Sequence, residues 1–222
     1  MTKTLSNTAR IAVVDDHGIV RFGYSQLINQ DPSLELCGMA SNEREGLEML
    51  GREQPDLAIA DLSLREGGGM DLIQAALKKR RQLKILVISV HDESLFAHRV
   101  LALGARGFIN KQEAPERLVE GIQTLLEGEL YFSETVKKHW IRGLLGTSVP
   151  ASLEGADSLS NRELQVFELI GNGYSTRQIA DALYLSVKTI ERHKENIKQK
   201  IGINHATQLT QHATQWVLQR WH

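Results

Sequence analysis

The sequence predicts an α/β domain built on a doubly wound, five-stranded parallel sheet, followed by a small all-α domain of four helices. Three observations predict this fold class: five short apolar runs in the first half, helical periodicity between them, and purely helical patterns near the end. Runs of this length are typical of strands that are covered on both faces of a sheet. The expected strands are Ile11–Val14, Leu34–Met39, Leu57–Ala60, Ile85–Val90 and Gly107–Ile109.

Between these runs, apolar residues recur with the spacing of one helix face. Strands that alternate with such helices predict a parallel sheet with right-handed crossovers, and here the pattern ends near Gly128. Pro115 can begin the last of these helices, because proline is favoured in a first helical turn. The residues expected to share a face are Val20, Tyr24, Leu27 and Ile28; Leu72, Ile73, Ala76 and Leu77; and Leu118, Ile122, Leu125 and Leu126.

The pattern changes after residue 128. Val136, Trp140 and Leu144 align on one face, which predicts an extra helix between Ser133 and Leu145. The stretch from Gly146 to Ser158 is rich in Gly, Ser and Pro without periodicity, so it reads as a linker. We therefore expect domains at 10–127 and 157–218, joined by the extra helix and linker at 128–156.

Four helices are expected in the second domain, three of them with a serine at the start. Ser160 with Glu163 three residues later predicts a capping box. Ser175 and Ser186 are expected to cap the next two helices, and Asn204 the fourth. The fourth would run over about Ala206–Leu218, with Leu209, Ala213, Trp216 and Val217 on one face, more as core than as a dimer contact.

Charge and cysteine content limit the class of protein. The chain of 222 residues has a net charge of −1. After Ala156 there are eight basic and six acidic residues (+2), against 18 and 21 before it (−3), which suggests domains with different partners. The single Cys37 excludes an intramolecular disulfide, and its setting predicts a small apolar residue in a buried strand.

Membrane and export signals are missing from the pattern. No stretch reaches the roughly 20 apolar residues that span a bilayer, and the first residues lack the apolar run of a signal peptide. We therefore expect a cytoplasmic protein that does not enter a membrane.

Chemically useful side chains follow four of the expected strands. Asp15 and Asp16 follow the first strand, Asp61 the third, Ser89 lies at the end of the fourth, and Lys111 follows the fifth. Ligands of doubly wound sheets bind at the carboxyl ends of strands. Three carboxylates there need a cation, and hard oxygen ligands suit Mg²⁺. A single aspartate at a strand end is usually a turn former or helix cap, so the prediction depends on the joint placement.

Residues 10–127 resemble the receiver domain of two-component response regulators. The motifs that carry the resemblance are Val13-Val14-Asp15-Asp16-His17, Asp56 through Leu62, Ile88-Ser89 and Gly104 through Lys111. The resemblance implies phosphotransfer from a histidine kinase to Asp61. It also implies Mg²⁺ bound by Asp16, Asp61 and the main-chain carbonyl of Ser63, with Asp15 acting through water. Ser89 and Lys111 would hold phosphoryl oxygens, and Phe108 would be the aromatic switch residue.

Three departures from the family pattern stand out. The proline usual four residues past the acceptor is absent, and Gly67, Gly68 and Gly69 follow in the same loop, which makes the loop geometry hard to infer. Gln112 follows the lysine in place of a frequent proline. Val90 follows Ser89 where small residues are common, which predicts tighter access to the phosphoryl group.

The second domain has a short helix, a turn and a longer basic helix, the arrangement of a helix-turn-helix. Its motifs, Leu159 through Glu163, Gly173 through Ala180 and Leu183 through Ile190, resemble the LuxR-type domain of NarL/FixJ regulators. The resemblance implies double-stranded DNA as partner, with the helix around Val187–Lys200 in the major groove. The expected DNA-binding residues are Lys188, Thr189, Glu191, Arg192, Lys194, Lys198 and Lys200.

Glu191 stands where the family commonly has a lysine that faces DNA. An acid repels phosphate but can accept a hydrogen bond from a cytosine amino group, whereas Arg192 is better suited to guanine. Judged by charge alone, the helix around Val187–Lys200 is about equally consistent with a solvated amphipathic helix and with a DNA-binding helix.

Three functional hypotheses remain from the sequence. The first is a response regulator whose phosphorylation favours homodimers, DNA binding and transcription, with RNA polymerase as a further partner. The second is an aspartate-nucleophile phosphatase, disfavoured because Ser63 stands where a second acid is needed; we therefore expect no enzyme and no catalytic residue in that sense. The third is a DNA-binding regulator that does not depend on phosphorylation.

Overall fold

The computed structural model describes residues 8–64, 68–91, 93–144 and 158–218. The chain forms two compact units, Met1–Ile141 and Arg142–His222, and each is considered by itself. The expected linker, Gly146–Ser158, lies outside the described residues except for Ser158.

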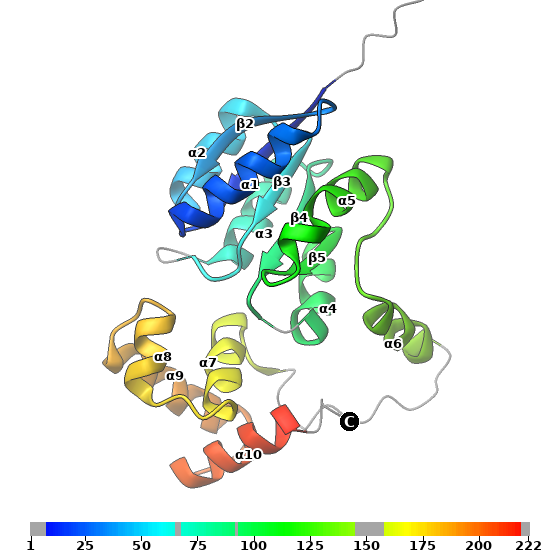
Figure 1. The fold of residues 1–222 in the computed structure, drawn as a ribbon. Coiled ribbons are helices and arrows are strands. Elements are labelled where there is room, and N and C mark those ends of the chain that lie inside the picture. The colour runs from blue at the N-terminus through cyan, green and yellow to red at the C-terminus, as the bar shows by residue number, and fades with distance from the viewer. Residues whose placement is uncertain (1–7, 65–67, 92, 145–157, 219–222) are drawn as a thin grey trace, which may run out of the picture. The chain divides into compact units, whose positions relative to one another are not determined.

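The first unit contains a five-stranded parallel sheet in the order β2-β1-β3-β4-β5 (Figure 1). The predicted fold class is therefore confirmed. The strand order reverses between β1 and β3, and this places the first acid pair next to the third strand's acid. The strands are β1 (Ala9–Val14), β2 (Leu34–Ala40), β3 (Leu57–Ala60), β4 (Lys84–Ser89) and β5 (Gly107–Asn110).

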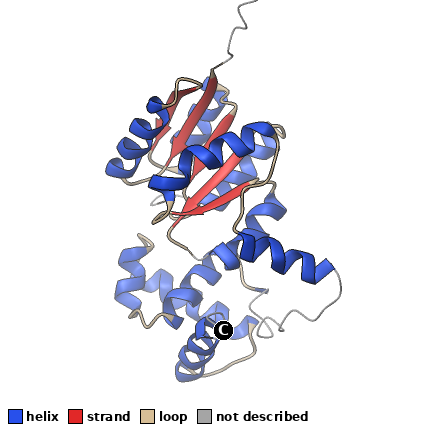
Figure 2. Ribbon diagram, turned by 45° about the vertical axis from the view of Figure 1, so that its right-hand side comes forward, coloured by secondary structure: helices blue, strands red, loops and turns tan. Residues whose placement is uncertain are grey.

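Helices cover both faces of the sheet (Figure 2). One pair, α1 and α5, packs together, and on the other side α3 contacts both α2 and α4. The core between the sheet and the first pair contains Ile11, Ile28, Leu118 and Ile122, all fully buried. The helices are α1 (Gly18–Gln30), α2 (Glu43–Glu53), α3 (Gly69–Lys79), α4 (Glu93–Leu103) and α5 (Ala114–Glu127).

Strands β2 and β5 lie at the two edges of the sheet, and β2 is the less buried of the two. Its middle residues are only partly buried, and Glu35 within it is exposed. The expectation that every strand is covered on both faces is therefore wrong for β2. Cys37 is half-buried rather than buried, and its Sγ lies 3.3 Å from the carbonyl oxygen of Ile11.

The segment after α5 returns to the sheet. Tyr131 accepts a backbone hydrogen bond from Phe108 (2.8 Å) and donates one to Arg106 (3.0 Å), so it lies beside β5. The backbone N–H of Ser133 then donates to Glu93 Oε1 at the start of α4. The predicted extra helix follows as α6 (Glu134–Leu144), with Val136 buried and Phe132 packed edge-on against Trp140.

The second unit, as far as it is described, is helical: α7 (Asn161–Gly171), α8 (Thr176–Ala182), α9 (Val187–Lys200) and α10 (Ala206–Leu218). The predicted capping box of Ser160 and Glu163 is present, and Ser175 and Ser186 cap α8 and α9. Asn204 does not cap α10, because that helix begins at Ala206 and its first helical backbone bond runs from Leu209 to His205.

Helix α10 packs on α7, and this contact explains one glycine. A Cβ at Gly171 would lie 2.4 Å from the carbonyl oxygen of Ala213, so only glycine fits there. Trp216 meets Phe167 at 5.2 Å between ring centroids. Leu209, Ala213 and Trp216 are buried, which favours the core role for this face.

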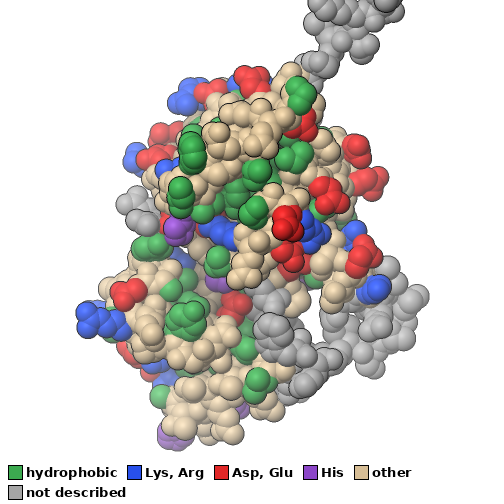
Figure 3. Space-filling view, in the orientation of Figure 1, with side chains coloured by type: hydrophobic (Ala, Val, Ile, Leu, Met, Phe, Trp, Pro, Cys, Tyr) green, Lys and Arg blue, Asp and Glu red, His purple; other side chains and the backbone are tan. Residues whose placement is uncertain are grey.

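The distribution of charge and the length of the helices complete the description. On the face shown in Figure 3, acidic and basic side chains are interspersed over the first unit rather than gathered in patches of one sign. Among the described residues, no helix is both long and apolar enough to cross a membrane.

Candidate phosphoryl and DNA sites

The carboxyl ends of the central strands bring the predicted acids together. Val14 pairs with Ala60 in the parallel ladder, and the N–H of Asp61 donates to the carbonyl of Val14 (2.9 Å). Asp15 and Asp61 follow these two paired positions, and each is only 1% exposed. Asp16 is also buried. Carboxylates on different strands thus share one small site.

Lys111 links two of these carboxylates. Its Nζ lies 2.6 Å from Asp61 Oδ2 and 2.7 Å from Asp15 Oδ2. The ammonium reaches them because the backbone N–H of Lys111 bonds to the carbonyl of Ser89, which fixes the residue at the end of β5 (2.8 Å). A single cation therefore compensates two buried anions, and the burial of such charges requires this pairing.

The charges shift the protonation of the groups around them. Burial raises the pKa of Asp61, and the nearby Asp15 adds to this, although Lys111 opposes both. Burial alone would lower the pKa of Lys111, but Asp61 and Asp15 outweigh it, so the pKa of Lys111 is raised. The pKa of buried Tyr24 is also raised, by burial first and then by Asp15 and Asp61.

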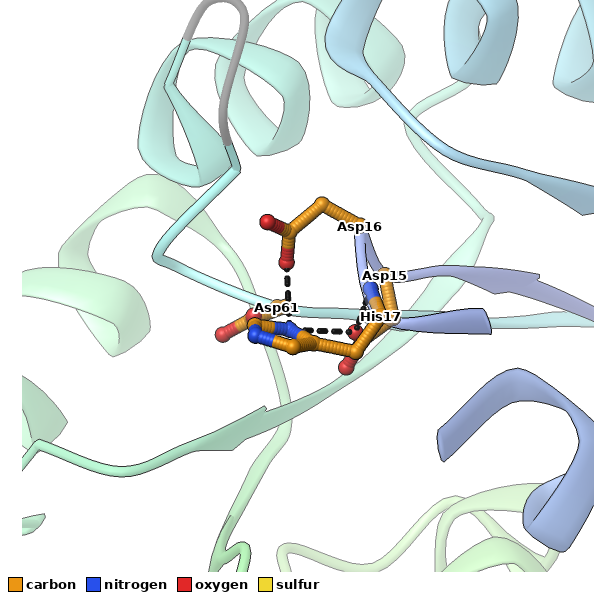
Figure 4. Close-up of side chains that lie close together, drawn as sticks. All are labelled: Asp15, Asp16, His17 and Asp61. Carbon is orange, nitrogen blue, oxygen red and sulfur yellow. Dashed lines mark hydrogen bonds and ion pairs between the residues drawn. The ribbon is translucent and has the colours of Figure 1, made fainter. Parts of the chain in front are cut away.

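His17 belongs to this cluster, although no role was predicted for it. Its Nδ1 lies 2.7 Å from Asp16 Oδ1 and 3.3 Å from Asp15 Oδ1, and its backbone N–H donates to Asp15 Oδ1 (2.8 Å) (Figure 4). Arg21 adds a bond to the carbonyl of Asp15 (2.6 Å). The position of His17 directly after the acid pair was the only signal in the sequence.

The donor set fits a divalent cation. One ligand atom each from Asp15, Asp16, His17 and Asp61 can be chosen so that all lie within 4.8 Å of one another. Carboxylate oxygens are the ligands that Mg²⁺ prefers. This cluster therefore has the chemistry that a Mg²⁺ site requires. The expected contribution of the Ser63 carbonyl stays a prediction.

A series of hydrogen bonds connects Asp61 to Ser63, His91 and Ser89. Ser63 donates its backbone N–H to Asp61 Oδ1 (3.1 Å), and its hydroxyl lies 2.9 Å from Nε2 of His91. The backbone N–H of His91 in turn donates to the hydroxyl of Ser89 (3.2 Å). The centroid of the His91 ring lies 4.9 Å from that of the Phe96 ring. The buried His91 was not singled out in the sequence, because its isolated position after β4 gave no signal.

Three other predicted features can now be placed. Phe108 is buried in β5, where it pairs with Val87. Val90 is 62% exposed, which argues against the tighter access expected from it. Gly69 is fixed by close packing, since a Cβ there would lie 2.0 Å from the carbonyl oxygen of Asp61. Gly67 lies outside the described residues.

Helices α8 and α9 form the predicted helix-turn-helix. Ile190 and Ile197 are buried, so the opposite side of α9 faces outward. Three of the five basic residues on α9 form ion pairs: Lys194 with Glu191 (3.0 Å), Lys198 with Glu195 (2.8 Å) and Lys200 with Glu163 (2.6 Å). Lys188 and Arg192 are exposed, and neither has an ion-pair partner within the described parts of the chain.

Comparison with protein families gives two matches. The family model described as "Response regulator receiver domain" matches residues 11–123. The model described as "Bacterial regulatory proteins, luxR family" matches residues 157–213.

Similar proteins extend over nearly the whole chain. The oxygen regulatory protein NreC of Staphylococcus carnosus is 30% identical over 92% of this chain and 96% of its own length. The structure of RcsB from Salmonella enterica serovar Typhimurium, bound to promoter rprA with phosphomimetic BeF₃⁻, is 25% identical. It covers 94% of this chain and 99% of that chain with a TM-score of 0.61. A structure of two RcsB dimers bound to two parallel DNAs is 26% identical, covers 94% and 98%, and has a TM-score of 0.56.

Proposed function

Because the chain belongs to the response regulators that join a receiver domain to a LuxR-type DNA-binding domain, we propose that phosphorylation of Asp61 controls its binding to double-stranded DNA. The observation that carries this proposal is the buried Asp61 carboxylate with Lys111 2.6 Å away, beside the carboxylates of Asp15 and Asp16. The Asp61 carboxylate can act as a nucleophile, and Lys111 beside it can bind the charged acyl phosphate that forms.

The proposed reaction transfers a phosphoryl group from a histidine of a kinase. A carboxylate oxygen of Asp61 forms a bond to phosphorus while the P–N bond breaks, and the kinase imidazole leaves with the electron pair and takes up a proton. Mg²⁺, held by Asp15, Asp16, Asp61 and the Ser63 carbonyl, would supply neutralisation of the phosphoryl charge. Lys111 exchanges its Asp61 contact for a phosphoryl oxygen, and Ser89 binds another.

We propose that the structural change caused by phosphorylation is transmitted from Asp61 through β4 and β5. Ser89 bonds to His91, and Phe108 in the neighbouring strand bonds to Tyr131, so displacement at Ser89 and Phe108 reaches α4 and the segment after α5. We propose that phosphorylation then favours a homodimer, which raises the local concentration of paired DNA-binding domains. The solved RcsB dimers on DNA support this step. RNA polymerase is a further partner in this proposal.

The experiment compares wild type with Asp61→Asn. Both proteins are incubated with acetyl phosphate and Mg²⁺ and examined for phosphate content, sedimentation and the affinity for a duplex selected from a random library. We expect phosphate, dimer and tighter DNA binding in wild type and none of these changes in Asp61→Asn. Asp71→Asn is the matched control, because Asp71 is exposed in the first turn of α3.

Two other results would contradict the proposal. Equal phosphate in Asp61→Asn would remove Asp61 as the acceptor. DNA binding that is identical in both proteins, with and without acetyl phosphate, would instead support the phosphorylation-independent regulator.

A docking surface for the kinase is proposed on α1. This helix begins directly after His17, and its Ile19 and Phe22 are 78% and 59% exposed. Neighbouring exposed apolar side chains often mark interaction sites. Phe22→Ser should slow transfer from a phosphorylated kinase but not from acetyl phosphate; equal slowing with both donors would contradict the docking role.

The domain boundaries are part of the proposal. We propose a receiver over 10–127, a connecting part over 128–156 and the DNA-binding domain over 157–218. Limited proteolysis should cut first between 145 and 157. A first cut inside either domain would contradict these boundaries.

A further inference from the structure

Helix α9 carries two acids on its outer side, and the surroundings of the two differ. Glu191 pairs with Lys194 and Glu195 pairs with Lys198, both three residues further along the helix. Pairs with this spacing on one helix surface are common and contribute only a few tenths of a kcal/mol, about 0.2–0.5. Among the described residues, the side chains of Glu195 and Lys198 make no further hydrogen bond or ion pair, so this is a pair of the ordinary kind.

The Glu191 pair also reaches another helix. The hydroxyl of Thr176, the first residue of α8, donates to Glu191 Oε1 (3.0 Å). Lys194 Nζ donates to the same Glu191 Oε1 (3.0 Å) and to the Thr176 oxygen (3.1 Å). The three side chains therefore form a closed triangle that joins α9 to the beginning of α8.

The triangle keeps Glu191 ionised and Lys194 engaged. Burial alone would raise the pKa of Glu191, but Lys194 and Thr176 outweigh it, so the pKa is lowered. The Lys194 side chain is only 20% exposed, against 51% for Glu191. An ammonium held this way has to break two contacts before it can bind a DNA phosphate.

We propose that Glu191 is a positioning residue that fixes α9 against α8 and holds Lys194 away from the DNA backbone. It therefore does not read a base. Sequence preference comes from Arg192, while Lys188, one helical turn before it on the outer side of α9, meets phosphate. This inference rests on the proposed DNA-binding function, and it assigns a role to the acid that replaces the family's usual lysine.

The first test uses the full-length protein and its sequence preference. Wild type, Glu191→Gln and Glu195→Gln each select duplexes from a random library. We expect the same selected sequence for all three. Loss of a single preferred base in Glu191→Gln alone would overturn the proposal, because it would show that this carboxylate reads that base.

The second test measures whether Glu191→Gln frees the Lys194 ammonium to bind a DNA phosphate. Affinity for a labelled random-sequence duplex is measured against salt concentration by fluorescence anisotropy. We expect Glu191→Gln to steepen the logarithmic salt dependence by about 0.9, one added phosphate contact. In a Lys194→Met background the same change should have no effect on the slope. A steepening that persists without Lys194 would overturn the proposal.

The third test needs no DNA, so it separates this inference from the proposed function. Hydrogen exchange of peptides from residues 176–200 should speed up in Glu191→Gln and Thr176→Val, and not in Glu195→Gln. Equal exchange in Glu191→Gln and Glu195→Gln would overturn the positioning role. A wild-type protein that bound no duplex would instead overturn the DNA-binding function.

Discussion

Lys111 and Lys194 each bridge two oxygen-bearing side chains, but they do so in different surroundings. The carboxylates around Lys111 come from two strands and are 1% exposed, whereas Glu191 beside Lys194 is 51% exposed on the surface of a helix. Loss of one partner of a buried pair costs about 3–5 kcal/mol, while an exposed pair contributes about 0.2–1 kcal/mol. The receiver charges thus act on stability and chemistry together, and the helix charges act mainly on recognition.

The largest expected effect is at Lys111. Lys111→Met leaves Asp15 and Asp61 uncompensated, so the free energy of unfolding should fall by about 3 kcal/mol without Mg²⁺. Added Mg²⁺ should restore more stability to Lys111→Met than to wild type, because the cation replaces the missing charge. Thermal unfolding with and without Mg²⁺ measures this. Lys79→Met, an exposed change on α3, is the control. An equal Mg²⁺ response in all three proteins would show that the carboxylates do not form the cation site.

The next effect is at Arg192 and concerns base preference. Arg192 is exposed on α9 and has no ion-pair partner among the described residues, so its guanidinium is available to a base edge. Arg192→Ala should lower affinity for the selected duplex by about 1–3 kcal/mol and lower it less for a mismatched duplex. Competition binding with both duplexes measures the difference. Equal losses on both would place Arg192 on the backbone instead.

A smaller and uniform effect is expected at Lys188. This residue is exposed at the beginning of α9, where a cation can meet phosphate. Lys188→Ala should weaken binding alike on matched and mismatched duplexes and reduce the logarithmic salt slope by about 0.9. Lys200→Ala provides the comparison, because Lys200 is paired with Glu163. A larger slope change in Lys200→Ala than in Lys188→Ala would contradict this division of the basic residues.

The smallest effect is a pH dependence of the helical unit. Burial alone would raise the pKa of Glu163. The ammonium of Lys200 and the hydrogen bonds with the backbone and the side chain of Ser160 outweigh burial and lower this pKa below its ordinary value of about 4.5. The resulting stabilisation is fully present above pH 4.5 and is lost as the pH falls through the lower folded-state pKa. Glu163→Gln keeps the capping shape without the charge and should remove this part of the acid sensitivity.

Hydrogen exchange of peptides from α7 at pH values from 3 to 6 measures this effect. Glu195→Gln should behave as wild type, since Glu195 is exposed. If Glu163→Gln retained the full acid sensitivity of α7, the pair with Lys200 would not be its source.

Much of the receiver site could be predicted because its positions are tied to strand ends. A parallel strand of four to six apolar residues is visible as a run, and the residue after it lies at the ligand-binding edge. Asp15, Asp16, Asp61 and Lys111 were found in this way. His17 and His91 were missed, because their contacts depend on side-chain directions in turns rather than on a repeating pattern.

The sequence by itself determined the order of strands and helices, the serine caps and the acids of the receiver, since these depend on periodicity and neighbouring residues. Only the tertiary structure decided that β2 is an edge strand, that Lys111 bridges Asp15 and Asp61, and that three lysines of α9 are paired. Such outcomes depend on distances between segments far apart in the chain. Thr176 and Glu191, or Glu163 and Lys200, meet only because packed helices bring them together.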